Sequence, residues 1–344
     1  MLTGSLLPGM FFGIVYSLGS WLNSGNMWVS LLAVIVYAVL VVVLITVFDY
    51  MFGWAERKIM AKAQSRHGPT KVGKYGILQN LADLIKLIAK SNYAPRNAKK
   101  FIFSFTIVLM LAISIFIILL LPFSQSLTVA NLGFGLLVIF VALAFMPIII
   151  FINGFASGNK FAAISAERSV VMLVSYEIPL LIIIASVAML SGSYNLVEII
   201  AAQAATHWYV LLMPIGFATF FIAMLAEFER PPFDIREADS ELIAGWLTDV
   251  SAPYFSLALF IDYTRMFLGS LVITMLFLGG WSGPGLLPPI FWLLAKSVAI
   301  ALVIIVIRAT MVRMRLDRLL RIGWMALLPL ALVNLILTFI IFVK

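Results

Sequence analysis

Cysteine is absent from the 344 residues, and acidic residues are scarce, with fifteen Asp and Glu in total. Without thiols the chain forms no disulfide and cannot ligate an iron–sulfur cluster. The only two histidines, His67 and His207, fall in segments that the charge pattern assigns to opposite faces of a membrane, which excludes a haem held between two spans. Any redox centre that this protein serves is therefore expected on a partner chain.

Charge of either sign is also rare. Charged residues make up 11% of the chain, whereas a soluble domain has roughly 25%. Hydrophobic residues account for 63%, and they form runs close to the roughly 20 residues that cross a bilayer. These runs do not alternate as the strands of a membrane β-barrel do. The sequence predicts an all-α integral membrane protein, a polytopic bundle of about eight transmembrane helices, near residues 28–50, 102–121, 131–153, 169–190, 208–226, 253–279, 289–310 and 322–343.

The whole chain, residues 1–344, is expected to form a single membrane domain. Its first 24 residues could be mistaken for a secretion signal, but no Lys or Arg precedes the apolar run, and Pro8, Gly9 and Gly13 interrupt it. We expect residues 1–24 to form an interfacial or half-inserted helix rather than a ninth span.

Lys and Arg are distributed very unevenly along the chain. Of the 23, eleven lie within residues 57–100 and five within 308–321, with pairs at 160–168 and 230–236, whereas the loops at 122–130, 191–207 and 280–288 have none. With eight spans, the basic segments fall on one face. The positive-inside rule then places them in the cytoplasm and both termini outside. The net charge of +8 thus reflects topology, and nucleic acid is not an expected partner.

Residues 53–101 form the first long cytoplasmic loop. Apolar residues recur at helical spacing from Ile77 to Ile88, which predicts an amphipathic helix too short to span a membrane. The helix either rests on lipid headgroups or roofs a cavity, with Arg57, Arg66 and Asp83 turned inward. Periodicity alone favours the first interpretation.

Residues 227–252 form the second functional loop, and it begins within the sequence AEFERPPFDIREADSELIAGW. Seven of the fifteen acidic residues lie between Glu227 and Asp249. Asp234 and Glu237 fit a capping box after the two prolines that end the preceding span. A solvated acidic face is one reading of the remaining acids. The shortness of the loop favours a partly dry cavity, where crowded carboxylates cannot all ionise and can exchange protons.

Ionisable residues also occur within the predicted spans. Glu177 lies in the fourth, Asp262 and Arg265 in the sixth, and Lys296 in the seventh, while Asp49 lies near the inner end of the first. A charge at this depth is costly and marks a functional candidate by default. Asp262 and Arg265 are one helical turn apart, so they could instead neutralise each other as a structural pair.

Several motifs occur in the order typical of one family. The first loop contains ERK at 56–58, Q-x-R-x-GP at 64–69 and AD-x-x-K at 82–86. The second contains R-x-PFD at 230–234, EADSEL at 237–242 and AG at 244–245, and LF-x-GGW follows at 276–281. From about residue 50 to its end the chain resembles the H subunit of NADH:quinone oxidoreductase (respiratory complex I), the family of mitochondrial NADH dehydrogenase subunit 1.

The resemblance implies a membrane-arm subunit of a complex I-type, proton-translocating oxidoreductase in a prokaryotic plasma membrane. Such a subunit binds a quinone or quinone-like carrier as substrate and has no catalytic residue, metal or covalent cofactor of its own. The implied partners are an iron–sulfur connecting module at the cytoplasmic loops, small membrane subunits and antiporter-like subunits. The implied quinone-chamber residues are Glu56, Arg57, Arg66, Asp83 and Phe233. The implied proton path comprises Glu177, Glu227, Arg230, Asp234, Glu237, Asp239, Glu241, Asp249 and Asp262.

Two other functions are compatible with parts of the sequence. The chain could be the homologous membrane subunit of a ferredoxin- or deazaflavin-linked dehydrogenase or of a membrane-bound hydrogenase. A stand-alone transporter is disfavoured because the acidic loop has no internal repeat. The chain also departs from the family pattern, with Glu229 where Asn is common and Arg236 at a Pro or Ala position.

Overall fold

The computed structural model describes residues 27–125, 127–129, 131–236, 239–284 and 287–342. Helices account for the regular secondary structure of these residues, and no strand occurs among them. This confirms the predicted all-α membrane fold. The interfacial helix expected for residues 1–24 lies outside the described residues.

Seven helices in the described part of the chain are long and apolar enough to cross a membrane. They are α2 (Met27–Ala63), α4 (Lys100–Leu120), α5 (Gly135–Ser157), α6 (Lys160–Ser191), α11 (Ala252–Phe277), α12 (Pro289–Thr310) and a C-terminal helix, in which α13 (Leu316–Ile322), the π-helical turn η3 (Gly323–Leu327) and α14 (Leu328–Phe342) follow one another. Each overlaps a span predicted from hydropathy.

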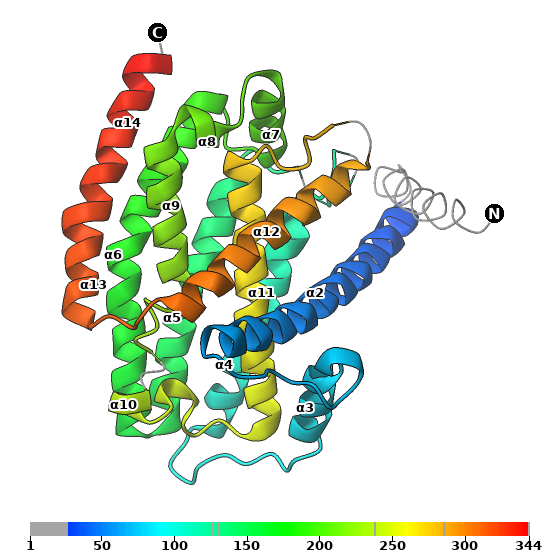
Figure 1. Ribbon diagram of the computed structural model, residues 1–344, viewed down its shortest axis with the longest axis vertical. Helices are drawn as coiled ribbons and strands as arrows, with labels where there is room; N and C mark the ends of the chain where they lie inside the picture. The colour runs from blue at the N-terminus through cyan, green and yellow to red at the C-terminus, as the bar shows by residue number, and fades with distance from the viewer. Residues whose placement is uncertain (1–26, 126, 130, 237–238, 285–286, 343–344) are drawn as a thin grey trace.

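The remaining predicted span, residues 208–226, is divided. It consists of α8 (Tyr209–Leu212) and α9 (Pro214–Glu227), and Pro214 begins the second piece because proline cannot donate to a preceding turn. The 14 residues of α9 extend only about 21 Å, less than the roughly 30 Å of a bilayer core. Beside it, α7 (Leu196–Ala205) folds over the end of the bundle that carries the loops without Lys or Arg (Figure 1).

The core of the bundle lies around α6 and α11. Helix α6 contacts α5, α9 and α14, while α11 contacts α2, α4 and α12. In Figure 1, α2 and α12 run obliquely across α11. The ring of Phe48 on α2 stacks on that of Phe267 on α11, with centroids 4.7 Å apart, and the ring of Phe52 contacts Phe267 at a tilt, with centroids 5.8 Å apart. The charged side chains of α11 are therefore enclosed by neighbouring helices and do not face lipid.

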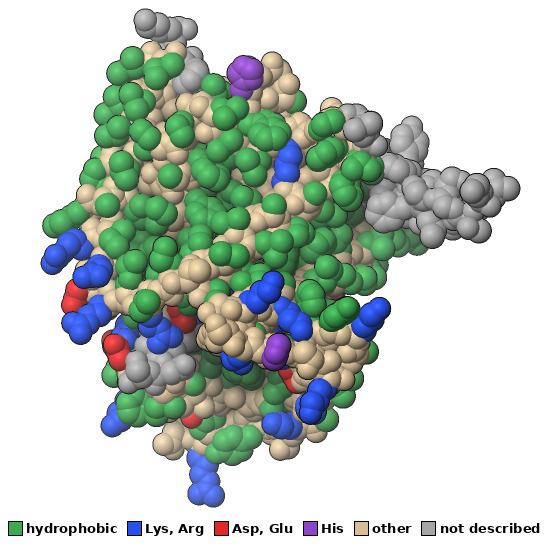
Figure 2. All heavy atoms as spheres, in the orientation of Figure 1, with side chains coloured by type: hydrophobic (Ala, Val, Ile, Leu, Met, Phe, Trp, Pro, Cys, Tyr) green, Lys and Arg blue, Asp and Glu red, His purple; other side chains and the backbone are tan. Residues whose placement is uncertain are grey.

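Lys and Arg are concentrated at one end of the molecule, which we call the basic end. It is formed by residues 53–101, 158–160, 228–236, 239–251 and 308–321. Figure 2 shows these side chains over the lower part of the visible face, while hydrophobic side chains cover most of the upper part. Such an apolar wall is what a helix bundle exposes to lipid, because backbone polar groups are satisfied within the helices.

The amphipathic helix predicted in the first loop is present as α3 (Gln79–Ile88) at the basic end. Asn80 donates to the backbone oxygen of Tyr50 at 3.0 Å, and Trp54 donates to that of Tyr75 at 3.2 Å, so the loop is held against α2. The side chains of Ile85 and Ile88 face outward and are exposed. Helix α3 thus lies on the bundle with part of its apolar face uncovered.

The capping box at Asp234 and Glu237 stays a prediction, because Glu237 lies outside the described residues. The Asp234 carboxylate accepts a hydrogen bond from Arg313 at 3.1 Å. The short helix α10 (Asp239–Leu242) follows in the chain.

Candidate functional site

The loop that follows α9 is buried. Pro231 and Pro232 cannot continue a helix, and Glu229 adopts a left-handed backbone conformation with φ of 52°. Phe228 and Phe233 are each 3% exposed, so they anchor the loop in the core. For the first half of the acidic loop the structure thus favours the cavity interpretation over a solvated acidic face.

One group of charges joins α2, the loop and α12. Glu56 accepts a hydrogen bond from Arg230 at 3.2 Å and forms an ion pair with Arg308. The Arg230 guanidinium also lies 4.9 Å from the ring centroid of Tyr263 on α11, a cation–π distance. Glu56 and Arg230 are both buried, so their ion pair offsets part of the loss of hydration of each.

A second group joins the loop to α11. Arg236 contacts Glu229 at 2.5 Å and Asp262 at 3.3 Å. Arg265 contacts the same Glu229 carboxylate at 3.5 Å and Glu227 at 3.9 Å. Asp262 and Arg265 therefore do not form the mutual pair that their spacing allowed. Each is paired instead with residues at the end of α9 or on the loop that follows it.

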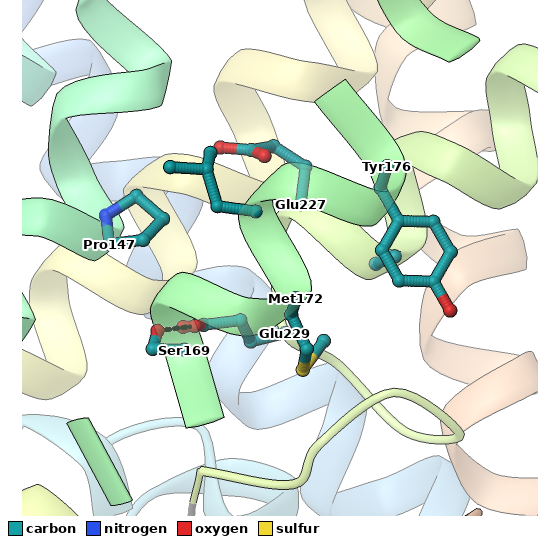
Figure 3. A pocket seen from close by; sticks show the side chains of 8 residues that line it. Pro147, Ser169, Met172, Tyr176, Glu227 and Glu229 are labelled. Carbon is teal, nitrogen blue, oxygen red and sulfur yellow. Dashed lines mark hydrogen bonds between the residues drawn. The ribbon is translucent and has the colours of Figure 1, made fainter. Parts of the chain in front are cut away.

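Two cavities lie beside these charges. The larger is about 80 Å³ and is lined by charged residues together with Phe228, Pro231, Leu259 and Tyr263. Its charged lining comprises Glu56, Glu229, Arg230, Asp234, Arg236, Asp262 and Arg308. The smaller is about 10 Å³ and lies between α5, α6 and the end of α9. Figure 3 shows Glu227 on one side of it and the hydrogen-bonded Ser169 and Glu229 on the other.

The residues implied for a quinone chamber are only partly brought together. Arg57 and Asp83 form an ion pair at 2.5 Å, but their side chains are 44% and 31% exposed. Arg66 is exposed and donates to Gln64 at 2.6 Å. Phe233 is buried against Tyr176, with an edge-to-face contact at 5.5 Å. Within the described residues, only Glu56 of this set lines the charged cavity.

The pKa of Asp83 has a clear physical origin. Partial desolvation alone would raise the pKa, but hydrogen bonds from Arg57 and Gln79 and the charge of Arg57 outweigh it, so the pKa of Asp83 lies below its ordinary value of 3.8. The carboxylate is thus stabilised in its charged form, as expected for an acid beside a guanidinium. It joins α3 to α2.

The residues implied for a proton path divide into an enclosed set and a surface set. Glu227, Arg230 and Asp234 are buried, Asp262 lines the cavity, and Glu177 is half-buried on α6. In contrast, Glu241 is 55% exposed in its pair with Arg168 at 2.6 Å. Asp249 lines an open groove of about 680 Å³ beside Arg96 and Lys160. Helix α10 begins at Asp239.

Sequence reasoning did not assign a site role to several residues that the structure places in these groups. They are Glu229, Arg236 and Arg308. Arg265 and Asp49 were functional candidates only because of their depth, and Asp49 accepts a hydrogen bond from Thr264 on α11. The available signal was a charge within or next to an apolar span. This signal does not identify the residue with which each charge pairs, because the two members of a pair lie far apart in the sequence.

Lys296, the charged residue predicted inside α12, has a different environment. Its ammonium group donates to the backbone oxygens of Leu278, Gly280 and Ser282, at 2.7, 3.2 and 2.7 Å. It also lies 4.6 Å from the ring centroid of Trp208. All three donors are used at the end of the bundle opposite the basic end, which indicates a structural cap on α11.

The described residues contain no group of three or more His, Asp or Glu that could hold a metal ion. The site is instead a set of buried arginine–carboxylate pairs around two cavities, in a bundle of apolar helices. Charges buried in a membrane bundle next to a cavity are typical of ion pathways and substrate chambers in membrane proteins. Fold and site together define a polytopic helical membrane protein with a small, charged cavity at its basic end.

The chain belongs to the NADH dehydrogenase family, which it matches over residues 34–339. It is 38% identical over 313 residues to the H subunit of NADH-quinone oxidoreductase from Dehalococcoides mccartyi (strain CBDB1), covering 91% of this chain and 87% of the relative. It is 34% identical over 336 residues to the corresponding subunit of Carboxydothermus hydrogenoformans, covering 96% and 95%. It is also 38% identical over 299 residues to the H subunit of F(420)H(2) dehydrogenase from Methanosarcina mazei, covering 82% and 85%.

Proposed function

We propose that this chain is the quinone-chamber subunit of a complex I-type, proton-translocating quinone oxidoreductase in a prokaryotic plasma membrane. It would contribute to the quinone chamber and convert the charge change of quinone reduction into ion movement. The observation that carries the proposal is the buried set of arginine–carboxylate pairs between α2, the acidic loop, α11 and α12. Family membership and the names of the relatives support the same function.

A partner chain would complete the substrate site. The enclosed cavity is about 80 Å³, whereas pockets for organic ligands have roughly 300–1,000 Å³. Arg57, Asp83 and Arg66 lie at the exposed surface of the basic end. We therefore assign them to the rim of a chamber that closes when an iron–sulfur connecting module docks there. Small membrane subunits and antiporter-like subunits would pack against the lateral faces of the bundle.

The path for charge would begin at Asp234 and Asp262 and continue to Glu227 and Glu177. Asp234 and Asp262 line the larger cavity, and Glu227 lines the smaller one. Reduced quinone needs protons, and neighbouring carboxyl groups that are partly dry can supply them. The loss of a proton at one group then changes the proton affinity of the next. Glu241 and Asp249, at the surface, would take part only where partner chains cover them.

The proposal is tested by comparing Glu227→Gln with Glu241→Gln in the assembled complex. We expect Glu227→Gln to lower both quinone reduction and proton pumping several-fold, because its carboxyl group lines the smaller cavity, beside residues of α5 and α6. Glu241→Gln should have a smaller effect, since its side chain lines neither cavity and is paired with Arg168. Reductase rates and proton uptake into vesicles are the measurements. Wild-type rates in a fully assembled Glu227→Gln complex would contradict the proposal.

A second candidate concerns the electron donor. The Methanosarcina mazei relative is a subunit of F(420)H(2) dehydrogenase and is as similar in sequence, at 38% identity, as the Dehalococcoides mccartyi relative. A deazaflavin-linked dehydrogenase would use the same chamber with a different input module. Mass spectrometry of the subunits that co-purify with this chain distinguishes the two, since an NADH-binding module and a deazaflavin-binding module differ in their chains.

A further inference from the structure

An open groove of about 680 Å³ lies at the basic end, where the segment after α3 passes the turn between α5 and α6. This segment crosses the lower edge of the molecule in Figure 1. The groove is lined by two cations, Arg96 and Lys160, and by one acid, Asp249. Two more cations, Lys99 and Lys100, lead from the groove into α4. Four cations against one acid make this part of the surface strongly positive.

The cations of the groove are not neutralised by the chain itself. Five other arginines at the basic end form ion pairs with carboxylates. Among the described residues, Arg96 and Lys160 form no ion pair, although Asp249 lines the same groove. The Lys160 ammonium lies 5.3 Å from the ring centroid of Phe161, a contact that leaves its N–H groups free to donate. Both cationic side chains are exposed and are therefore available to an anion from outside the chain.

Backbone contacts fix the walls of the groove. The N–H of Lys99 donates to the carbonyl oxygen of Ala156 at 2.9 Å, so the start of α4 is tied to the end of α5. Gly158 adopts φ of 73°, and a Cβ at this position would lie 2.9 Å from the carbonyl oxygen of Asn97. Glycine thus permits both the turn and the close approach of the two segments. The groove is held in shape by the chain on either side of it.

Two side-chain amides add neutral hydrogen-bond donors to the lining. Asn159 uses its Oδ1 atom to accept from the N–H of Phe161 at 3.1 Å, which leaves its NH2 group for another acceptor. Asn97 also lines the groove, and its side chain is exposed. Cations and amide N–H groups together suit a ligand whose oxygens only accept hydrogen bonds, such as a phosphodiester.

Exposed apolar side chains begin directly beside the groove. Phe101, next to Lys100 in the first turn of α4, is 80% exposed, and its ring stacks on that of Phe105 with centroids 5.7 Å apart. On α6, the exposed Ile164 lies one turn after Lys160, about 6 Å along the helix. The groove thus lies where the lipid-facing wall meets the charged end, which is the level of phospholipid headgroups.

We propose that this groove binds the headgroup of an anionic phospholipid from the cytoplasmic leaflet. The phosphate oxygens would accept hydrogen bonds from Arg96 and Lys160, and an acyl chain would lie along Phe101 and Phe105. Basic pockets beside transmembrane helices on the cytoplasmic side are suited to anionic headgroups. The groove shares no lining residue with the two cavities beside the buried ion pairs, so this site is separate from the proposed quinone chamber.

The same features favour a lipid over other anions. A soluble phosphate would use the cations but not the exposed rings of α4. A protein segment rich in Asp and Glu would bring several negative charges close to Asp249, which repels them. A zwitterionic headgroup would bring its own cation toward Arg96 and Lys160. A single phosphodiester attached to hydrocarbon meets none of these difficulties.

The test measures labelling of the assembled complex by a photoactivatable phosphatidylglycerol with a diazirine on its acyl chain. The complex is placed in phosphatidylcholine vesicles that contain a small fraction of this probe, and labelled peptides are mapped by mass spectrometry after irradiation. We expect label on the first turns of α4. Each Lys or Arg near an anionic lipid strengthens binding roughly fivefold, so Arg96→Gln/Lys160→Gln should lower this labelling about fivefold or more. Both residues are exposed and without an ion pair, so the variant should assemble normally.

A matched control removes two cations elsewhere at the basic end. Lys71→Gln/Lys74→Gln deletes the same charge from exposed positions that line neither the groove nor the two cavities. It should leave the labelling of α4 at the wild-type level. A phosphatidylcholine probe with the same diazirine should label α4 several-fold less. Unlabelled phosphatidylglycerol should compete with the probe, whereas glycerol 3-phosphate should not.

Three results would overturn the inference. The first is equal labelling of α4 by the two probes, or in the wild type and Arg96→Gln/Lys160→Gln, because the cations would then not select the lipid. The second is competition by glycerol 3-phosphate, which would indicate a site for soluble anions. The third is absence of label from α4, and an amine cross-link from Lys160 to a partner chain would then identify what covers the groove.

Discussion

Glu56 illustrates how much a single buried carboxylate supports at the basic end. It is 4% exposed and paired with both Arg230 and Arg308. Replacing it by Gln keeps the shape but leaves two guanidinium groups without this counter-charge. Loss of one member of a buried pair costs about 3 kcal/mol or more, so Glu56→Gln should lower the free energy of unfolding by that amount. Denaturant unfolding in a mild detergent measures it.

The control for Glu56→Gln is a variant of the neighbouring residue on α2, Arg57. Arg57→Gln breaks only the partly exposed pair with Asp83, and such pairs contribute about 0–1 kcal/mol. An equal loss of unfolding free energy in Glu56→Gln and Arg57→Gln would contradict this prediction. It would show that burial does not strengthen the ion pairs of Glu56.

At this scale the sequence identified many of the charged positions but not their partners. Two positions where the chain departs from the family pattern, Glu229 and Arg236, prove to contact each other at 2.5 Å. Helical spacing allowed Asp262 and Arg265 to pair with each other, yet each binds the acidic loop. Helix periodicity relates residues within one element, whereas these contacts depend on how a loop without regular structure enters the bundle.

Helix α3 is the element whose attachment should respond most simply to pH. The lowered pKa of Asp83 means that its pair with Arg57 stabilises the docked helix at any pH above the ordinary value of 3.8 and is lost as pH falls through the lowered pKa. We expect hydrogen exchange in residues 79–88 to speed up over that acidic range. Asp83→Asn should show fast exchange already at neutral pH, with a weaker pH response. A response as steep as that of the wild type would contradict this role.

The helices that the sequence predicted correctly are those that depend only on the pattern of hydrophobic residues. The seven long helices and α3 follow directly from apolar runs and helical spacing. The division of residues 208–226 at Pro214 was missed, although proline at that position gives a physical reason for it. The contact of Asp234 with Arg313 was not predicted, because the two residues lie 79 positions apart in the chain.

The absence of cysteine offers a direct test of topology for the whole molecule. Single cysteines at Ser91 and at Thr206, two exposed positions at opposite ends of the bundle, would be the only thiols in the chain. If the positive-inside assignment holds, a membrane-impermeant maleimide added to intact cells labels Thr206→Cys but not Ser91→Cys. Inverted vesicles should give the reverse pattern. Labelling of both from the same side would exclude the assigned orientation.

The ion pairs of Glu56 also constrain how the protein is made. Its partner Arg230 comes 174 residues later in the chain, and Arg308 comes later still, on α12. When α2 leaves the translocation machinery, neither arginine has been synthesised, so the Glu56 carboxylate has to stay hydrated or take up a proton until both arrive. The ion pairs of Glu56 can therefore form only after α12, which carries Arg308, has been inserted.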